Sequence, residues 1–154
     1  MSDDAVRPVR LTVDLAHAVA VLHRTSFDDR LPWLAGLHTP DEDDWFFSAV
    51  VFPTCTVWGS FDGDALIGFI ALRPGWIDHL YVLPGQQGRG VGTALLEVAK
   101  AGGQELALWT FQRNAGARRF YERHGFVAVE LTDGAGNEER EPDVRYRWQA
   151  GRAR

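Results

Sequence analysis

The chain has 154 residues, of which 45% are hydrophobic and 24% are charged, and this balance predicts one soluble globular domain with a substantial core. The formal net charge of −5 argues against a nucleic-acid partner, and the chain shows neither a signal peptide nor an apolar run of about 18 residues. We therefore expect a cytoplasmic protein without a membrane role. The single Cys55 excludes an internal disulfide, and because no metal-binding motif occurs we expect no metal.

The N-terminal half predicts a strand, two helices and a hairpin. Residues 6–12 form the expected first strand, and apolar residues recur at helical spacing through residues 15–27. Residues 39–42, Thr-Pro-Asp-Glu, carry a capping box with proline at the first helical position, so a second helix is expected to begin there. An Asp-Gly turn then joins two expected strands at residues 54–60 and 66–72.

The C-terminal half predicts two helices, at residues 93–101 and 114–124, and four more strands. These strands are expected at residues 76–83, 106–111, 126–131 and 144–148. Over the whole chain the order β-α-α-β-β-β-α-β-α-β-β predicts a single α/β domain with a mixed, twisted sheet at residues 1–150. Residues 151–154 are expected to form a flexible tail.

The turn between the strand at residues 76–83 and the helix at residues 93–101 predicts an anion site. Glycines at positions 88, 90 and 92 let the backbone come close to a ligand, and the helix adds its unpaired N–H groups. A dinucleotide fingerprint would need glycine where this chain has Thr93, and a Walker A loop would need a lysine that is absent here. An ordinary nucleotide-binding α/β domain is therefore disfavoured.

Two motifs resemble the GNAT superfamily of N-acetyltransferases. Residues 87–92, Q-G-R-G-V-G, are similar to the family's acetyl-coenzyme A loop, Q/R-x-x-G-x-G/A. Residues 114–126, N-A-G-A-R-R-F-Y-E-R-H-G-F, match its second signature, N-x-x-A-x-x-F-Y-x-x-x-G-F, at every defined position. The resemblance implies the GNAT fold, with about seven strands and about four helices. It also implies that the fourth and fifth strands splay apart, so that the thioester lies between residues 76–83 and 106–111.

The resemblance implies transfer of an acetyl group from acetyl-coenzyme A to a primary amine of a small molecule or peptide, directly and in a ternary complex. This reaction needs a base or a water route for one amine proton and an acid for the leaving sulfur. The resemblance places the acid on Tyr121, whose alternative is a ring packed beneath the sheet. Asp78 stands where some members carry a catalytic glutamate, with hydrogen bonding at the strand edge as its alternative. Alternation places Asp78 on the face of Leu80 and Val82, and puts His79, a second candidate base, on the other face.

The same resemblance assigns residues to the cofactor. The amides from Gln87 to Thr93 are expected to hold the pyrophosphate. The Val82 backbone is expected to pair with the pantetheine arm or the acetyl carbonyl. The Asn114 side chain is expected to face the pantetheine, with a plain helix cap as its alternative. Arg89 is expected to meet a phosphate, with an ordinary exposed loop position as its alternative. The expected cofactor-binding residues are Leu80, Val82, Gln87, Gly88, Arg89, Gly90, Val91, Gly92, Thr93, Asn114, Ala117, Phe120 and Tyr121.

The resemblance places the acceptor site at the first two helices, their loop and residues 137–141. The expected acceptor residues are Trp33, His38, Asp78 and His79, with Trp45 and Phe46 as further aromatic candidates. Aromatic rings and acids can attract a cationic amine, but these residues also fit core or solvated-loop roles. The rival reading is a non-catalytic acyl-coenzyme A sensor or partner-binding module, although the presence of both Tyr121 and Asp78 favours the enzyme. Because dimers are frequent in similar proteins, a homodimer is also predicted.

Overall fold

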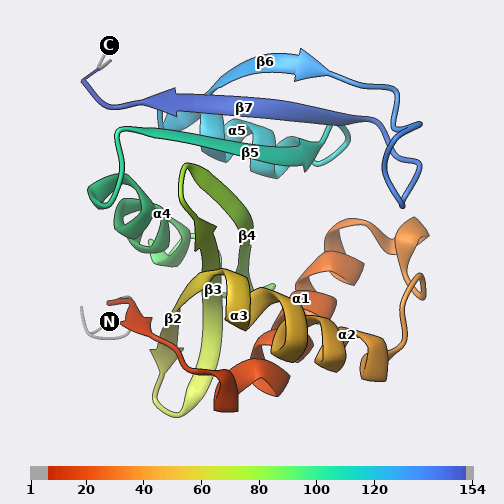
Figure 1. Ribbon diagram of the computed structural model, residues 1–154, viewed down its shortest axis with the longest axis vertical. Helices are drawn as coiled ribbons and strands as arrows, with labels where there is room; N and C mark the ends of the chain where they lie inside the picture. The colour runs from red at the N-terminus through yellow and green to blue at the C-terminus, as the bar shows by residue number, and fades with distance from the viewer. Residues whose placement is uncertain (1–6, 152–154) are drawn as a thin grey trace.

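The computed structural model describes residues 7–151, in which one sheet runs through the whole molecule (Figure 1). Its strands are β1 (Val9–Arg10), β2 (Thr56–Asp62), β3 (Ala65–Arg73), β4 (Trp76–Val82), β5 (Glu105–Phe111), β6 (Val127–Leu131) and β7 (Asp143–Gln149). They lie in the order β1-β2-β3-β4-β5-β7-β6, and only β4 and β5 are parallel. This seven-stranded mixed sheet confirms the expected fold class.

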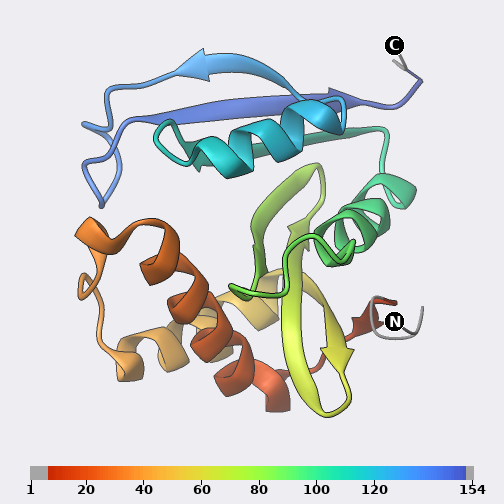
Figure 2. The same ribbon diagram turned by 180° about the vertical axis from the view of Figure 1, so that it is seen from behind.

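Helices cover both faces of this sheet (Figure 2). The longer helices are α1 (Ala16–Arg30), α2 (Pro40–Phe46), α4 (Val91–Ala101) and α5 (Ala115–Arg123). Shorter helical turns are η2 (Val13–Leu15), η3 (Pro32–Leu34), η4 (Phe47–Val51) and α3 (Phe52–Thr54). Among residues 7–151, no helix is both long enough and apolar enough to cross a lipid bilayer.

Two apolar clusters hold the helices on the sheet. One lies beneath α4 and α5, where Leu95, Leu96 and Leu108 are almost completely buried. The other lies beneath α1 and η4, around Phe47 and Phe69, both with no exposed surface. Because the strands alternate their side chains between the two faces, each face of the sheet can bury a separate set of apolar residues.

Several boundaries differ from those expected. The first strand is reduced to Val9–Arg10, and residue 6 of the expected strand lies outside the described residues, as do residues 152–154 of the expected tail. The strand expected at residues 54–60 begins only at Thr56, because the chain is still helical before it. There Pro53 fits the first turn, and the Thr54 hydroxyl donates to the Val50 carbonyl at 2.6 Å.

The fourth and fifth strands splay apart, as the resemblance implied. Strand pairing between β4 and β5 is confined to Trp76 opposite Ala107, where the Ala107 N–H also donates to the Gly75 carbonyl at 2.9 Å. Beyond this point the strands diverge, and Figure 1 shows β4 turning away from β5. Past Trp76 and Ala107, the facing edges of β4 and β5 are therefore not paired with each other.

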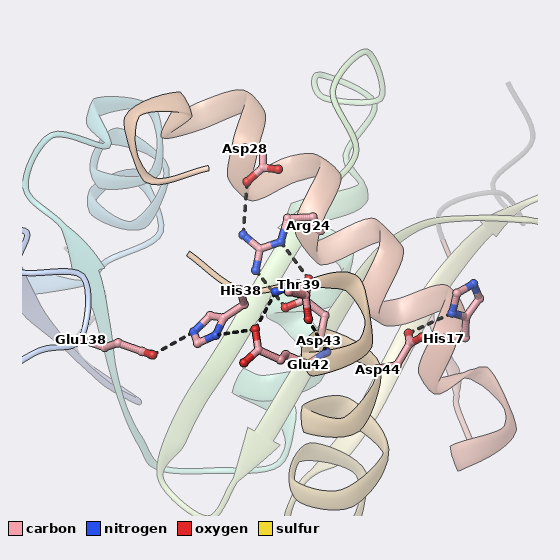
Figure 3. Close-up of polar contacts among 9 residues, drawn as sticks. All are labelled: His17, Arg24, Asp28, His38, Thr39, Glu42, Asp43, Asp44 and Glu138. Carbon is pink, nitrogen blue, oxygen red and sulfur yellow. Dashed lines mark hydrogen bonds and ion pairs between the residues drawn. The ribbon is translucent and has the colours of Figure 1, made fainter. Parts of the chain in front are cut away.

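An ion-pair network joins α1 to α2 on one side of the sheet (Figure 3). The Arg24 guanidinium donates twice to the buried Asp43 carboxylate, at 2.9 Å in each case, and once to Asp28 at 3.2 Å. The expected capping box is present, because Thr39 Oγ1 accepts from the Glu42 N–H while the Glu42 carboxylate accepts from the Thr39 N–H. The sequence signal at residues 39–42 is therefore confirmed.

We expect Asp43→Asn to lower the free energy of unfolding by about 1 to 3 kcal/mol, because an amide cannot accept both charged hydrogen bonds and Arg24 loses its nearest counter-charge. Urea denaturation followed by circular dichroism measures this change. The matched control is Asp41→Asn in the same turn, where the side chain is exposed, and its effect should stay within about 1 kcal/mol. Equal losses in the two variants would contradict a stabilising role for the Arg24 pair.

Candidate active site

A cavity of about 770 Å³ lies where β4 and β5 diverge, and the start of α4 and the length of α5 close its sides. Its volume falls within the range of about 300 to 1,000 Å³ that is typical of small-molecule sites. Twelve of the residues expected to bind the cofactor line it: Leu80, Val82, Gln87, Gly88, Gly90, Val91, Gly92, Thr93, Asn114, Ala117, Phe120 and Tyr121. Arg89 does not line it, and its guanidinium donates to Asp62 and Gln86 instead.

The glycine loop lines this cavity through Gly88, Gly90 and Gly92. Gly88 and Gly90 have φ angles of 84° and 82°, in the left-handed region that favours glycine. Gly90 is the N-cap of α4, so the unpaired N–H groups and the positive end of the helix dipole follow directly after it. A Cβ at Gly92 would lie 3.3 Å from the Phe120 ring, so glycine lets α5 pack closely against α4. This local geometry suits a phosphate group.

A side-chain anchor ties the loop to β4. Gln87 Nε2 donates to the Val82 carbonyl at 3.2 Å, and the buried Ser26 hydroxyl donates to the same carbonyl at 3.3 Å. Val82 thus connects the loop, the strand and α1 at one carbonyl oxygen. The glycine residues that follow Gln87 are held beside the gap between the strands.

Helix α5 supplies the opposite wall of the cavity. Asn114 caps the helix, since its Oδ1 accepts from the Ala117 N–H at 3.2 Å. Tyr121 is 7% exposed and packs with its ring centroid 5.5 Å from that of Phe126. Burial raises the pKa of the Tyr121 phenol above its usual value, and the nearby Tyr81 raises it further. Tyr121 therefore carries its proton at neutral pH, as a proton donor must.

Asp78 lies in a β-bulge that the alternation pattern does not reveal. The register of β3 against β4 shifts at Ala71, and Asp78 is the extra residue on β4. Because of this extra residue, the alternation of side chains between the two faces of the sheet cannot be counted from Leu80 back to Asp78. Its carboxylate accepts from Arg73 Nη2 at 2.8 Å and from Cys55 Sγ at 3.5 Å. Burial raises the pKa of the Asp78 carboxyl, but the Arg73 guanidinium outweighs this effect and leaves the pKa below its ordinary value.

His79 also lines the cavity and belongs to a cluster of rings that includes His23, Phe47 and Phe69. Its ring centroid lies 5.4 Å from that of Phe47 and 5.6 Å from that of His23. Burial lowers the pKa of His79 to about 4, and burial likewise lowers the pKa of His23 well below its ordinary value. Both imidazoles are therefore neutral at neutral pH, and each retains one nitrogen that can accept a proton.

The cavity and the loop lie within a segment that matches a known family. A family model described as an acetyltransferase (GNAT) domain matches residues 53–128, which hold β2 to β5, the glycine loop, α4 and α5. This segment matches the GNAT superfamily.

Similar proteins agree with this family. The uncharacterized N-acetyltransferase MJ1207 of Methanocaldococcus jannaschii is 36% identical over 84 residues, which cover 44% of this chain and only 37% of that relative. The solution structure of apo YjaB from Escherichia coli is 22% identical, with a TM-score of 0.76 over 92% of this chain and 95% of that one. The PaiA N-acetyltransferase of Thermoplasma acidophilum, solved with coenzyme A, is 19% identical, with a TM-score of 0.68 over 93% and 98% of the two chains. These two structures share the GNAT fold.

The two segments expected to shape the acceptor side of this GNAT domain meet in the structure. Trp33 Nε1, from η3, donates to Glu141 Oε1 at 2.9 Å. His38 Nε2 lies 2.9 Å from Glu138 Oε1 in the β6–β7 loop (Figure 3). Neither Trp33 nor His38 lines the cavity, so both join segments around the site and do not face the gap itself.

A second cavity of about 200 Å³ lies beside the first. The end of α1, β5 and the β6–β7 loop surround it, and the two cavities share Arg30, Tyr81, Trp109, Thr110 and Asn114. Together the cavities form a larger space next to the glycine loop and a smaller one next to the β6–β7 loop.

Sequence reasoning missed Tyr81 and Arg30. Tyr81 follows His79 by two residues, so alternation along the strand could have placed both on one face. Burial raises the pKa of the Tyr81 phenol to about 12, so it is protonated at neutral pH. No local signal marks Arg30, because it reaches the cavities from the end of α1. Among residues 7–151, no three His, Cys, Asp or Glu side chains are grouped to hold a metal ion.

Proposed function

We propose that this chain transfers an acetyl group from acetyl-coenzyme A to a primary amine of a small molecule or peptide in a ternary complex. One observation carries the proposal: the glycine loop, Asn114 and Tyr121 line one cavity at the β4–β5 gap. The coenzyme A in the similar PaiA structure supports the same ligand here. Acetyl-coenzyme A supplies the activated acetyl group, and the protein supplies binding, orientation and proton transfer.

Each wall of the cavity has a proposed task. The N–H groups after Gly90 and the dipole of α4 bind the pyrophosphate. The β4 backbone at Leu80 and Val82 lies along the pantetheine arm, and Asn114 faces the same arm from α5. Tyr121 donates its proton to the leaving sulfur, because its raised pKa keeps the phenol protonated. Asp78 and His79 are the proposed proton acceptors, each directly or through one water.

The pH dependence of Asp78→Asn tests whether the pKa of Asp78 is lowered in the active protein. Because the pKa of Asp78 is lowered, its carboxylate stays ionised from about pH 5 to 8, and its protonation cannot cause a loss of activity in that range. The fall in kcat/KM toward acidic pH should therefore follow the acceptor amine and persist in Asp78→Asn. The measurement is kcat/KM against pH for both proteins. A flat acidic limb in the variant would show that Asp78 titrates as the base and that Arg73 does not hold its pKa down.

Two measurements on the full chain test the proposed function. Isothermal titration calorimetry should detect acetyl-coenzyme A binding, and free thiol should appear with at least one member of a panel of amines, aminoglycosides, polyamines and peptides. Binding without thiol release would favour the non-catalytic sensor, whereas no binding would overturn both readings. Cytoplasmic location and a homodimer stay predictions from the sequence.

A further inference from the structure

Arg30, at the end of α1, is a cation that lines both cavities. The residue is half-buried. Within residues 7–151 its guanidinium forms no hydrogen bond or ion pair, whereas Arg24 on the same helix is engaged by Asp28 and Asp43. Tyr81 lines both cavities together with Arg30, and Tyr121 lines the larger one.

The smaller cavity beside Arg30 is largely apolar on one side. Phe27 and Leu31 are 7% and 3% exposed, and the Phe27 ring centroid lies 6.3 Å from that of Phe111 in an edge-to-face arrangement. Glu139 lines the same cavity, and its carboxylate makes no hydrogen bond or ion pair with any residue in the described part of the chain. The site therefore combines one available cation, an apolar wall and one available carboxylate.

This combination specifies the chemistry of an acceptor. We propose that the acceptor is an α-amino acid with an apolar side chain, and that Arg30 binds its carboxylate. The inference rests on the function proposed above. A guanidinium matches a carboxylate with two parallel hydrogen bonds, and Phe27, Leu31 and Phe111 offer apolar surface to the side chain. Glu139 repels a second acidic group, which disfavours dianionic phosphates and acidic amino acids in the same cavity.

The reaction balances with this acceptor. The amino nitrogen forms a bond to the acetyl carbonyl carbon, and the carbon–sulfur bond of the thioester breaks. The amine gives up one proton and the departing sulfur gains one. The products are an N-acetyl amino acid and free coenzyme A, so thiol release reports each turnover.

The test compares acceptors that differ only at the carboxylate. L-leucine is assayed against L-leucinamide and isoamylamine, and L-phenylalanine against L-phenylalaninamide and phenethylamine, with thiol release as the readout. The amides have an amine pKa of roughly 8, like a peptide N-terminus, and lose a proton more easily, so the chemical bias opposes the expected result. We expect kcat/KM to be at least about tenfold higher for the free amino acids.

Arg30→Gln should remove this preference, so that kcat/KM for the amino acid falls to about that of its amide while the amide's own value hardly changes. Arg30→Lys keeps the positive charge but cannot form the two parallel hydrogen bonds of a guanidinium, so it should retain part of the preference for the free amino acid. Arg10→Gln, at an exposed position on β1, is the matched control and should behave as the parent protein. The affinity for acetyl-coenzyme A, measured by calorimetry, should be unchanged in all three variants.

Each other outcome overturns the inference. Equal or better use of the amides or decarboxylated amines would remove the carboxylate from the acceptor but leave the proposed acetyltransferase function standing. A preference that survives in Arg30→Gln would move carboxylate binding to another residue, and weaker acetyl-coenzyme A binding would assign Arg30 to the cofactor. No thiol release with any amine, despite cofactor binding, would overturn the proposed function as well.

Discussion

Tyr121→Phe is expected to lower turnover about 10- to 1000-fold while leaving acetyl-coenzyme A affinity nearly unchanged. The ring remains in its place against Phe126, and only the hydroxyl group is lost. If Tyr121 protonates the departing sulfur, that step must then draw its proton from water. Steady-state thiol release with a saturating amine gives the turnover, and calorimetry gives the affinity.

Tyr146→Phe is the matched control for this experiment. Tyr146 is fully buried and its ring lies 6.2 Å from that of Tyr121, but its hydroxyl donates to Glu122 at 2.6 Å and accepts from Arg118. Loss of that hydroxyl should lower stability and leave turnover of the folded protein near the parent value. Unchanged turnover in Tyr121→Phe, or equal losses in both variants, would remove the proton-donor assignment and leave Tyr121 a packing role.

The second large effect is expected for Gly90→Val, which should weaken acetyl-coenzyme A binding about 10- to 100-fold. Gly90 has a φ of 82°, and a β-branched residue is strongly disfavoured there. Relief of this strain must change the backbone at the N-cap of α4, which lines the cavity. A Cβ at Gly90 would meet nothing within 4 Å, so the strain comes from the backbone conformation and not from the Cβ position.

Gly63→Val separates this effect from general destabilisation. Gly63 lies in the β2–β3 turn with a φ of 62°, and a Cβ there also meets nothing within 4 Å. Both variants should therefore lower the thermal midpoint by similar amounts, but only Gly90→Val should raise the dissociation constant in calorimetry. Equal cofactor affinity in the two variants would argue against a role for the loop in binding.

Local hydrogen bonding explains which elements the sequence predicted well. The capping box at residues 39–42 and the Asn114 cap depend on atoms within three residues of one another, and both are present. The glycine loop is equally local, since the left-handed φ at Gly88 and Gly90 is a property of those residues themselves. The two sequence motifs, at residues 87–92 and 114–126, lie on the predicted loop and helix, and both line the larger cavity.

Contacts between distant segments explain what the sequence did not predict. The bulge at Asp78 arises from its register against β3, and the Arg73 pair that lowers the pKa of Asp78 depends on the same hairpin. Arg30 reaches both cavities only because α1 packs against β3 and β4 (Figure 2). Periodicity within one segment carries no information about either contact.

The sequence by itself determined the element order, the caps, and a glycine loop followed by a helix, because propensity and local hydrogen bonds act over a few residues. Tertiary structure alone decided where β4 and β5 part, that His79 lies neutral among aromatic rings, and that Arg30 stands unpaired beside a small apolar cavity. These features depend on which distant surfaces are buried together, and burial sets both the space and the charge of the site. The motifs point to the cofactor, whereas packing between α1, β4 and the β6–β7 loop shapes the smaller cavity, where we propose that the acceptor binds.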